Sequence, residues 1–219
     1  MRKLWWLFAL IFLLLGCSVH TESSPTGTVS DQTSLRENLN QIVKRQLDRK
    51  PLCFSIILED HSDYRFVGEQ KGADWTLKSE GTDEPIELTK KGDQIELVQS
   101  ENREKLSPRQ LGLISPRDHL ILLQEAAGRI KPIPAPEEGI EGMEIVLDKG
   151  KIGQIVEQQM GSQDTAREIA LNASRKIQVR YHLWYRTRDR ELTRMEIHLD
   201  STNPSSDLEK HVRYIFRNP

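Results

Sequence analysis

The chain has 219 residues, and its 31 lysines and arginines against 33 aspartates and glutamates give a formal net charge of −2. Neither sign dominates a long block, which argues against a nucleic-acid partner, because nucleic-acid-binding domains usually carry a basic stripe. Only two cysteines are present. Because Cys17 has the separate role described next, Cys53 has no disulfide partner, and we expect it to be packed as a free structural thiol.

The N-terminal segment that ends at Cys17 is typical of an exported lipoprotein. Arg2 and Lys3 precede an apolar run over residues 4–15, which is shorter than the ~20 residues needed to cross a bilayer. The run closes on Leu-Leu-Gly-Cys and matches the lipobox of bacterial lipoproteins, whose cysteine is lipidated and becomes the mature N-terminus. We predict a signal peptide over residues 1–16, a palmitate-type lipid anchor on Cys17 and a location on the extracytoplasmic face of the cell membrane. An uncleaved anchor with a chance cysteine is the alternative.

Residues 17–34 are rich in serine and threonine and show no hydrophobic period. We therefore predict a flexible tether there, between the lipid and a single domain at 35–219. Ser34 and Glu37 have the spacing of a capping box at the start of a helix. Apolar residues follow at helical spacing until Pro51, which would end the helix. An amphipathic helix of about four turns is expected at the start of the domain.

Short alternating segments follow this helix. They lie between residues 52 and 97 and are separated by turn signals such as Lys71-Gly72 and Lys91-Gly92-Asp93. Period-two alternation with such turns predicts an antiparallel meander in which each strand has one apolar and one polar face. One face of the sheet is then expected to be buried and the other solvated.

Two Ser-Pro-Arg sequences predict helix starts at Ser107 and Ser115, with serine as the N-cap and proline at the first helical position. The second opens a strongly apolar helix, which we expect to end at Gly128 and to be buried against the sheet. The proline-rich residues 131–136 predict an extended connection outside the strand ladder. Residues 152–174 return to a helical period.

The last third of the chain predicts a hairpin. Strand-like alternation over residues 179–185 and 195–199 flanks a charged turn near Asp189, and a final strand is expected over 212–216. An earlier strand is expected over 142–147. Tyr181, Leu183 and Tyr185 share one face of this hairpin, which is apolar, and the other face is mainly polar.

The polar face of the hairpin carries His182, His198 and Glu196. The expected turn places the two histidines opposite each other with the carboxylate close by, and these side chains can bind zinc. A structural zinc site has four ligands, so a solvated cross-strand pair is the simpler interpretation, and we predict no metal site and no cofactor. Trp184 lies on the same face and is expected to be covered by the helical segment 152–174. If it were exposed, it would mark a partner site.

The sequence contains no nucleophile elbow, P-loop, dinucleotide-binding loop, zinc-protease motif or paired redox cysteines. Carboxylate pairs such as Glu141 and Glu144 resemble the acid and base of a glycosidase. They are expected in turns or at strand edges, where acidic residues normally face solvent. We therefore predict no catalytic residues and a protein that is not an enzyme.

The order of elements resembles the LolA/LppX-type half-barrel lipoproteins. The resemblance covers residues 35–216 and rests on the first helix, the meander, the helix opened by Ser115-Pro-Arg117 and the aromatic hairpin Tyr181-His-Leu-Trp-Tyr185. It implies an α+β fold, with a curved antiparallel sheet of about 9–11 strands. The helices would pack on or inside the concave face of this half-barrel.

The same resemblance implies a non-enzymatic binding module, because the sheet of this group lines a cavity that takes up acyl chains. The ligand would be an acyl chain, including that of a lipoprotein, or another apolar molecule. The apolar face that would bind it consists of Phe54, Ile56, Tyr64, Phe66, Trp75, Leu77, Tyr181, Leu183, Tyr185 and Met195. These residues could equally form a dry core, and the helical segment 152–174 could fill the cavity. The alternative function is a protein-docking lipoprotein that tethers or activates a cell-envelope or spore-germination enzyme.

Overall fold

The computed structural model describes residues 29–58, 65–81, 84–106, 115–160, 176–201 and 209–217, together with positions 168 and 172. In these residues the helices are α2 (Val29–Leu47), α4 (Pro116–Ala126) and α5 (Lys149–Met160). The strands are β1 (Leu52–Leu58), β2 (Arg65–Lys71), β3 (Asp74–Glu80), β4 (Ile86–Lys91), β5 (Gln94–Gln99), β6 (Asn102–Leu106), β7 (Ala127–Ile133), β8 (Ile140–Leu147), β9 (Ile177–Arg186), β10 (Leu192–Ser201) and β11 (Glu209–Arg217). Within this part of the chain no helix has both the length and the hydropathy needed to cross a membrane.

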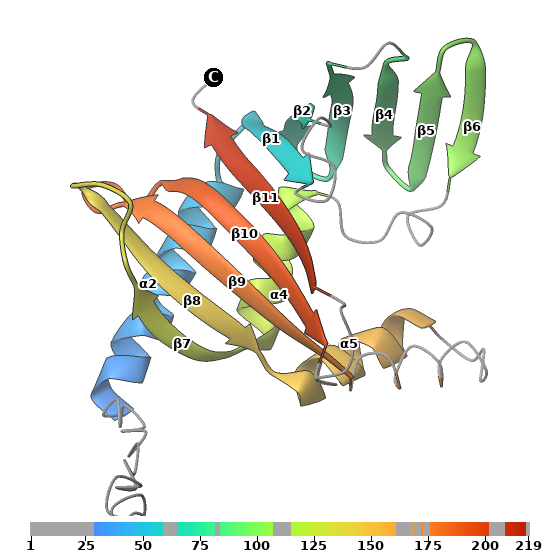
Figure 1. The fold of residues 1–219 in the computed structure, drawn as a ribbon. Helices are drawn as coiled ribbons and strands as arrows, with labels where there is room; N and C mark the ends of the chain where they lie inside the picture. The colour runs from blue at the N-terminus through green and yellow to red at the C-terminus, as the bar shows by residue number, and fades with distance from the viewer. Residues whose placement is uncertain are drawn as a thin grey trace, which may run out of the picture.

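The eleven strands form one antiparallel sheet in the order β6-β5-β4-β3-β2-β1-β11-β10-β9-β8-β7 (Figure 1). Strands β1 to β6 form one meander and β7 to β11 form a second, and β11 returns to pair with β1 at the centre of the sheet. Phe54 of β1 lies opposite Phe216 of β11, so residues from the two ends of the domain meet in the middle of the sheet. The predicted antiparallel meander and the strand number are confirmed.

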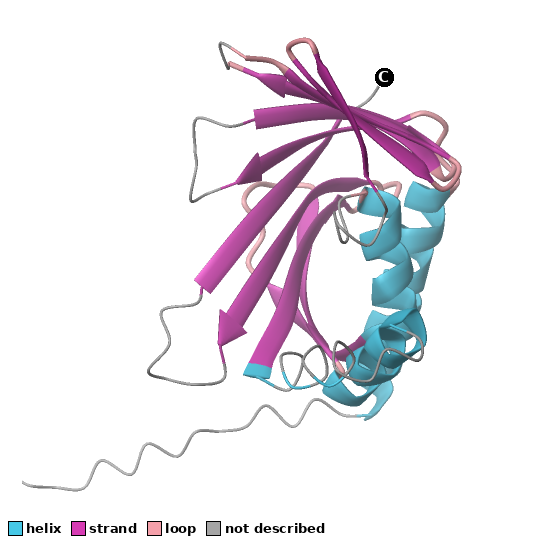
Figure 2. Ribbon diagram, turned by 90° about the vertical axis from the view of Figure 1, so that its right-hand side faces the viewer, coloured by secondary structure: helices cyan, strands magenta, loops and turns pink. Residues whose placement is uncertain are grey.

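The helices α2 and α4 lie on the concave side of this curved sheet, as Figure 2 shows. We call this side the inner face and the opposite side the outer face. Leu39 and Ile42 of α2 and Leu120 and Leu123 of α4 are all 0 % exposed and belong to the hydrophobic core. The predicted α+β half-barrel with helices on the concave face is therefore confirmed.

Two-residue turns connect β2 to β3, β4 to β5 and β5 to β6 in the first meander. Gly72 and Gly92 have φ values of +67° and +57°, a left-handed conformation that glycine adopts at no steric cost. Strand β6 was not predicted, because its residues show no apolar alternation. Its side chains are mostly exposed and charged, and charged side chains on an edge strand discourage pairing with another chain.

Helix α4 begins as predicted and ends differently. The side chain of Ser115 accepts a hydrogen bond of 3.2 Å from the backbone N–H of Asp118, and Pro116 occupies the first turn. The expected end at Gly128 is wrong, because the helix ends at Ala126 and the chain enters β7 directly. Gly128 instead allows a close approach of two strands, since an added Cβ would lie 2.8 Å from the carbonyl oxygen of Val146.

Two further expectations are corrected. Helix α2 begins at Val29, so Ser34 lies inside it and the capping box is wrong. Residues 131–133 belong to β7 rather than to an extended connection. Strand β7 is an edge strand that pairs only with β8 in the described sheet. Pro132 is tolerated there because an edge strand can leave one side of its backbone without ladder hydrogen bonds.

Helix α2 is hydrogen-bonded to this edge strand. The side-chain amide of Gln32 donates to the carbonyl oxygen of Ile130 at 2.7 Å. Nη2 of Arg36 donates to the carbonyl oxygens of Ala127 at 2.8 Å and Gly128 at 3.0 Å. Side chains of α2 therefore cover the backbone of β7 and hold the helix against this end of the sheet.

Candidate functional site

The inner face carries the residues that we expected to bind an apolar ligand. Eight of them are buried in the core with at most 5 % exposure: Phe54, Ile56, Trp75, Leu77, Tyr181, Leu183, Tyr185 and Met195. Phe66 is partly buried and packs against this core, while Tyr64 and the predicted lipidation site Cys17 lie outside the described residues. The structure thus brings the predicted residues together on one face. In this conformation their side chains are packed in the protein core.

A polar triad lies within this core and was not predicted. His119 of α4 contacts the hydroxyl of Tyr181 through Nδ1 at 2.8 Å and the hydroxyl of Tyr214 through Nε2 at 3.2 Å. Burial raises the pKa of both tyrosines above the ordinary value. Sequence reasoning missed His119 because a lone histidine in an apolar helix gives no indication of its partners. The triad fixes α4 to β9 and β11.

A second polar contact connects α2 to the sheet. The amide of Asn38 donates to the hydroxyl of Tyr185 at 2.7 Å, and this hydroxyl donates to Glu141 at 2.7 Å. Burial and the hydrogen bond to Glu141 raise the pKa of Tyr185 to about 12. The predicted apolar face therefore contains tyrosines whose hydroxyl groups are used for helix attachment.

Two hollows lined by described residues lie away from the predicted ligand face. One of about 180 Å³ is lined by residues of β4, β5 and β6, and the other, of about 10 Å³, lies at the end of α2. Ligand pockets for small molecules usually measure ~300 Å³ or more. The buried residues of the inner face belong to one hydrophobic core with side chains of α2 and α4, so an apolar ligand that contacted them would replace those side chains.

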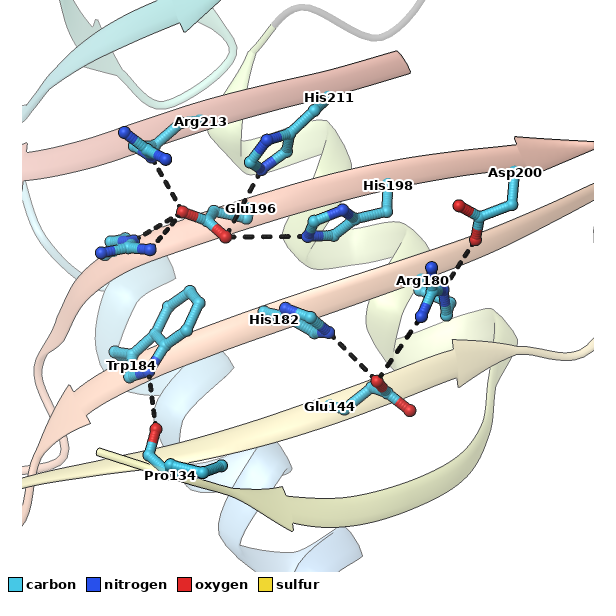
Figure 3. A network of polar contacts seen from close by, with 11 residues as sticks. Pro134, Glu144, Arg180, His182, Trp184, Glu196, His198, Asp200, His211 and Arg213 are labelled. Atoms are coloured by element: carbon cyan, nitrogen blue, oxygen red, sulfur yellow. Dashed lines mark hydrogen bonds and ion pairs between the residues drawn. The ribbon is translucent and has the colours of Figure 1, made fainter. Parts of the chain in front are cut away.

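The outer face carries a second group of chemistry-bearing residues, centred on Glu196 (Figure 3). This carboxylate is only 4 % exposed. Its Oε1 accepts hydrogen bonds of 2.8 Å from Arg194 and 2.8 Å from Arg213, while Oε2 lies 3.6 Å from Nε2 of His198 and 3.4 Å from Nε2 of His211. Burial alone would raise the pKa of Glu196, but the two arginines outweigh burial and lower it. Glu196 is therefore a buried, ionised carboxylate.

A second buried carboxylate, Glu144, lies on the neighbouring strand β8 and is 6 % exposed. It accepts from Nε2 of His182 at 3.1 Å and pairs with Lys131 at 3.0 Å. Burial raises its pKa, and the hydrogen bonds from Lys131 and His182 outweigh that effect and lower it. The expectation that Glu141 and Glu144 lie in turns or at strand edges facing solvent is wrong for Glu144, because β8 is flanked by β7 and β9.

The histidines of the outer face form a row across three strands. The rings of His182 and His198 lie 4.5 Å apart between centroids, and those of His198 and His211 are stacked at 4.2 Å. Glu196, rather than His198, lies directly opposite His182. The predicted register between β9 and β10 is therefore wrong by two residues. His211 pairs directly with His198. It was missed, although the alternation of Val212, Tyr214 and Phe216 places it on the polar face.

Trp184 is covered, as expected, and its described contacts are with Arg194 and Pro134. It is 8 % exposed. The guanidinium of Arg194 lies 4.2 Å from the ring centroid, and the indole N–H donates to the carbonyl oxygen of Pro134 at 3.3 Å. Helix α5 covers residues 152–160 of the predicted helical segment and contacts α4; apart from positions 168 and 172, the rest of that segment lies outside the described residues. Cys53, on the same outer face, is half-buried rather than fully packed.

These features define a class of protein: an open half-barrel of antiparallel strands with helices on its concave face. The crystal structure of the Mycobacterium tuberculosis lipoprotein LppX has this fold, with a TM-score of 0.52, 9 % sequence identity and coverage of 84 % of this chain and 94 % of LppX. LprF from Mycobacterium bovis gives a TM-score of 0.47 and 10 % identity over 85 % of this chain and 92 % of LprF. No family model matches the chain, and no curated protein matches it. The similarity to LppX confirms the expected fold.

Proposed function

We propose that this chain is a membrane-anchored extracytoplasmic lipoprotein and a non-enzymatic binding module for an acyl chain or another apolar ligand. The observation that carries the proposal is the inner face, an apolar surface that runs from β3 to β9 and is covered by helices rather than by a second sheet. The LppX-type fold supports it, since LppX is itself described as a lipoprotein. The lipobox at Cys17 supplies the anchor.

The helices are the part of the structure that a ligand would displace. The side chains of Leu39 and Ile42 fill the inner face from α2, and a methylene chain offers the sheet the same apolar contacts. Helix α2 begins twelve residues after Cys17. At full extension these residues span at most roughly 40 Å, so the helix that covers the inner face stays close to the lipid surface.

The anchor is tested by Cys17→Ala, with Cys53→Ala as the matched control. The Cys17→Ala protein is expected in the soluble fraction without an acyl mass, while the Cys53→Ala protein stays on membranes. A Cys17→Ala protein that remained on membranes at wild-type levels would refute the anchor.

Ligand binding is tested by native mass spectrometry of the protein extracted from membranes, together with titration of a fluorescent fatty acid. We expect a co-purifying lipid mass and saturable probe binding. Leu39→Ala should increase probe binding, because it removes a side chain that competes with the ligand. Gln41→Ala, on the exposed side of α2, should leave binding unchanged. Absence of both lipid and probe binding would refute the ligand proposal.

The closed inner face favours a second candidate, a lipoprotein that docks on a cell-envelope or spore-germination enzyme. Because the charged side chains of β6 discourage general pairing, strand addition at this exposed edge would require a partner strand of complementary charge. Cross-linking on membranes would then capture one stoichiometric partner, and Glu104→Pro in β6 would abolish the capture. If no partner is captured, or if the proline variant captures it equally well, docking through β6 is wrong.

A further inference from the structure

The outer face contains three imidazoles and a carboxylate that converge from adjacent strands. His182 lies on β9, Glu196 and His198 on β10, and His211 on β11. One ligand atom from each of His182, Glu196 and His198 lies within 4.8 Å of the other two. Nε2 of His211 is 3.4 Å from the same carboxylate oxygen. We propose that these four side chains bind one zinc ion.

The distances suit tetrahedral coordination. Zinc bonds of about 2.0–2.1 Å to nitrogen and oxygen place neighbouring ligand atoms roughly 3.3–3.4 Å apart. The separations of 3.4 Å and 3.6 Å from Oε2 of Glu196 to His211 and His198 lie close to this value. His211 is not among the three side chains whose ligand atoms all lie within 4.8 Å of one another, so its ring would have to turn for all four to reach one ion.

For Glu196 and His198, the surroundings favour the protonation states that zinc requires. A metal site needs neutral imidazoles and an ionised carboxylate. Burial lowers the pKa of His198, and the neighbouring His211 and His182 lower it further. Nε2 of His198 is buried and has no hydrogen-bond partner among the described residues, so a metal at this nitrogen would displace no hydrogen bond that the structure shows. Glu196 is held ionised by Arg194 and Arg213 as described above.

The surrounding residues also support the ligands. Nε2 of His182 donates to Glu144, which leaves Nδ1 as the ring nitrogen that can bind a metal. A carboxylate on the far nitrogen of a ligating histidine is a recurrent feature of zinc sites, where it fixes the tautomer and orients the ring. Arg194 and Arg213 both bind Oε1 of Glu196, so Oε2 remains for the metal.

The donor set indicates which metal would bind. Three imidazoles and one carboxylate suit zinc and its borderline neighbours, whereas calcium and magnesium require oxygen ligands. Four protein ligands close the site, and closed zinc sites are structural. Zinc would therefore connect β9, β10 and β11 on the face opposite the proposed ligand, so this inference does not depend on the proposed function.

The test uses the full chain, freed of metal with a chelator, and competes it for zinc against a chromophoric chelator. We expect one equivalent of zinc to bind and to raise the unfolding temperature. His198→Ala and His211→Ala should each weaken zinc binding at least about tenfold, and Glu144→Gln should weaken it roughly 10- to 100-fold. Glu125→Gln, an exposed carboxylate on α4, is the control and should bind zinc like the wild type.

A second measurement needs no variant. Zinc should protect His182, His198 and His211 from modification by diethyl pyrocarbonate, read by peptide mass spectrometry. Failure of the wild-type protein to bind a stoichiometric zinc ion would overturn the proposal. Uptake that persists in both histidine variants, or that leaves the three histidines unprotected, would also overturn it.

Discussion

The buried triad of His119, Tyr181 and Tyr214 gives the sharpest test of how α4 is held under the sheet. All three side chains are at most 6 % exposed, and each hydroxyl contacts one ring nitrogen. His119→Leu keeps a similar volume but leaves both hydroxyls without this partner. A buried hydroxyl left without a partner costs about 1–3 kcal/mol, and the loss at Tyr181 should lower the free energy of unfolding by at least about this amount.

The matched control removes the hydroxyls as well. In the triple variant His119→Leu, Tyr181→Phe, Tyr214→Phe, no polar group of the triad is left unpaired. Replacing all partners of a buried hydrogen bond by apolar groups can be nearly neutral. The triple variant should therefore be more stable than His119→Leu alone, although it carries two more substitutions.

Urea unfolding followed by far-ultraviolet circular dichroism measures both effects. A lower midpoint with an unchanged slope reports a loss of stability without a change in the surface exposed on unfolding. The reasoning is refuted if His119→Leu costs less than about 1 kcal/mol, below the range expected for even one buried unpaired group. It is also refuted if the triple variant is no more stable than His119→Leu.

Three other contacts give measurable outcomes. Because the folded-state pKa of Tyr185 is raised to about 12, its contribution to stability should be complete below pH ~10 and lost as the pH rises from ~10 to ~12. Between pH ~10 and ~12, the free energy of unfolding measured by circular dichroism should fall less steeply with pH in Tyr185→Phe than in the wild type. An equal fall in both proteins would contradict this. Arg36→Ala removes the hydrogen bonds to β7 and should raise amide exchange of this strand, against an unchanged rate in β3. Gly68→Ala places a Cβ 2.5 Å from Cζ of Phe54 and should lower the free energy of unfolding in urea by about 1–3 kcal/mol. A loss near zero would show that the Phe54 ring can move aside and would contradict this.

Periodicity was enough to predict the described strands other than β6 and β7, together with their apolar face. The residues at 181, 183 and 185 alternate clearly, and all three are buried on the inner face. The first meander also followed from the sequence, because glycine at 72 and 92 marks two-residue turns. Local pattern is a reliable guide here, since each strand pairs with its neighbour in sequence over most of the sheet.

Local pattern gave no information on contacts between distant elements. His119 meets Tyr181 and Tyr214 only because α4 crosses beneath two particular strands, and nothing near residue 119 indicates this. The true start of α2 was missed for the same reason. Gln32 reaches the backbone of β7, nearly a hundred positions later in the chain. Such contacts stabilise a helical turn that its own serine- and threonine-rich sequence does not favour.

The division of the second meander into an apolar and a polar face depends on one irregularity in β10. Leu192 pairs with Tyr185 and faces inward at 1 % exposure, while Arg194 pairs with Trp184 and faces outward. Strict alternation from Leu192 would place every even-numbered residue of the strand on the inner face, including Glu196. The extra residue Thr193 reverses the alternation at this bulge, and its hydroxyl donates to the carbonyl oxygen of Trp184 at 2.9 Å. A single inserted residue therefore keeps the charged residues out of the core and places Glu196 beside the histidines, so the inner and outer faces of this strand are fixed together.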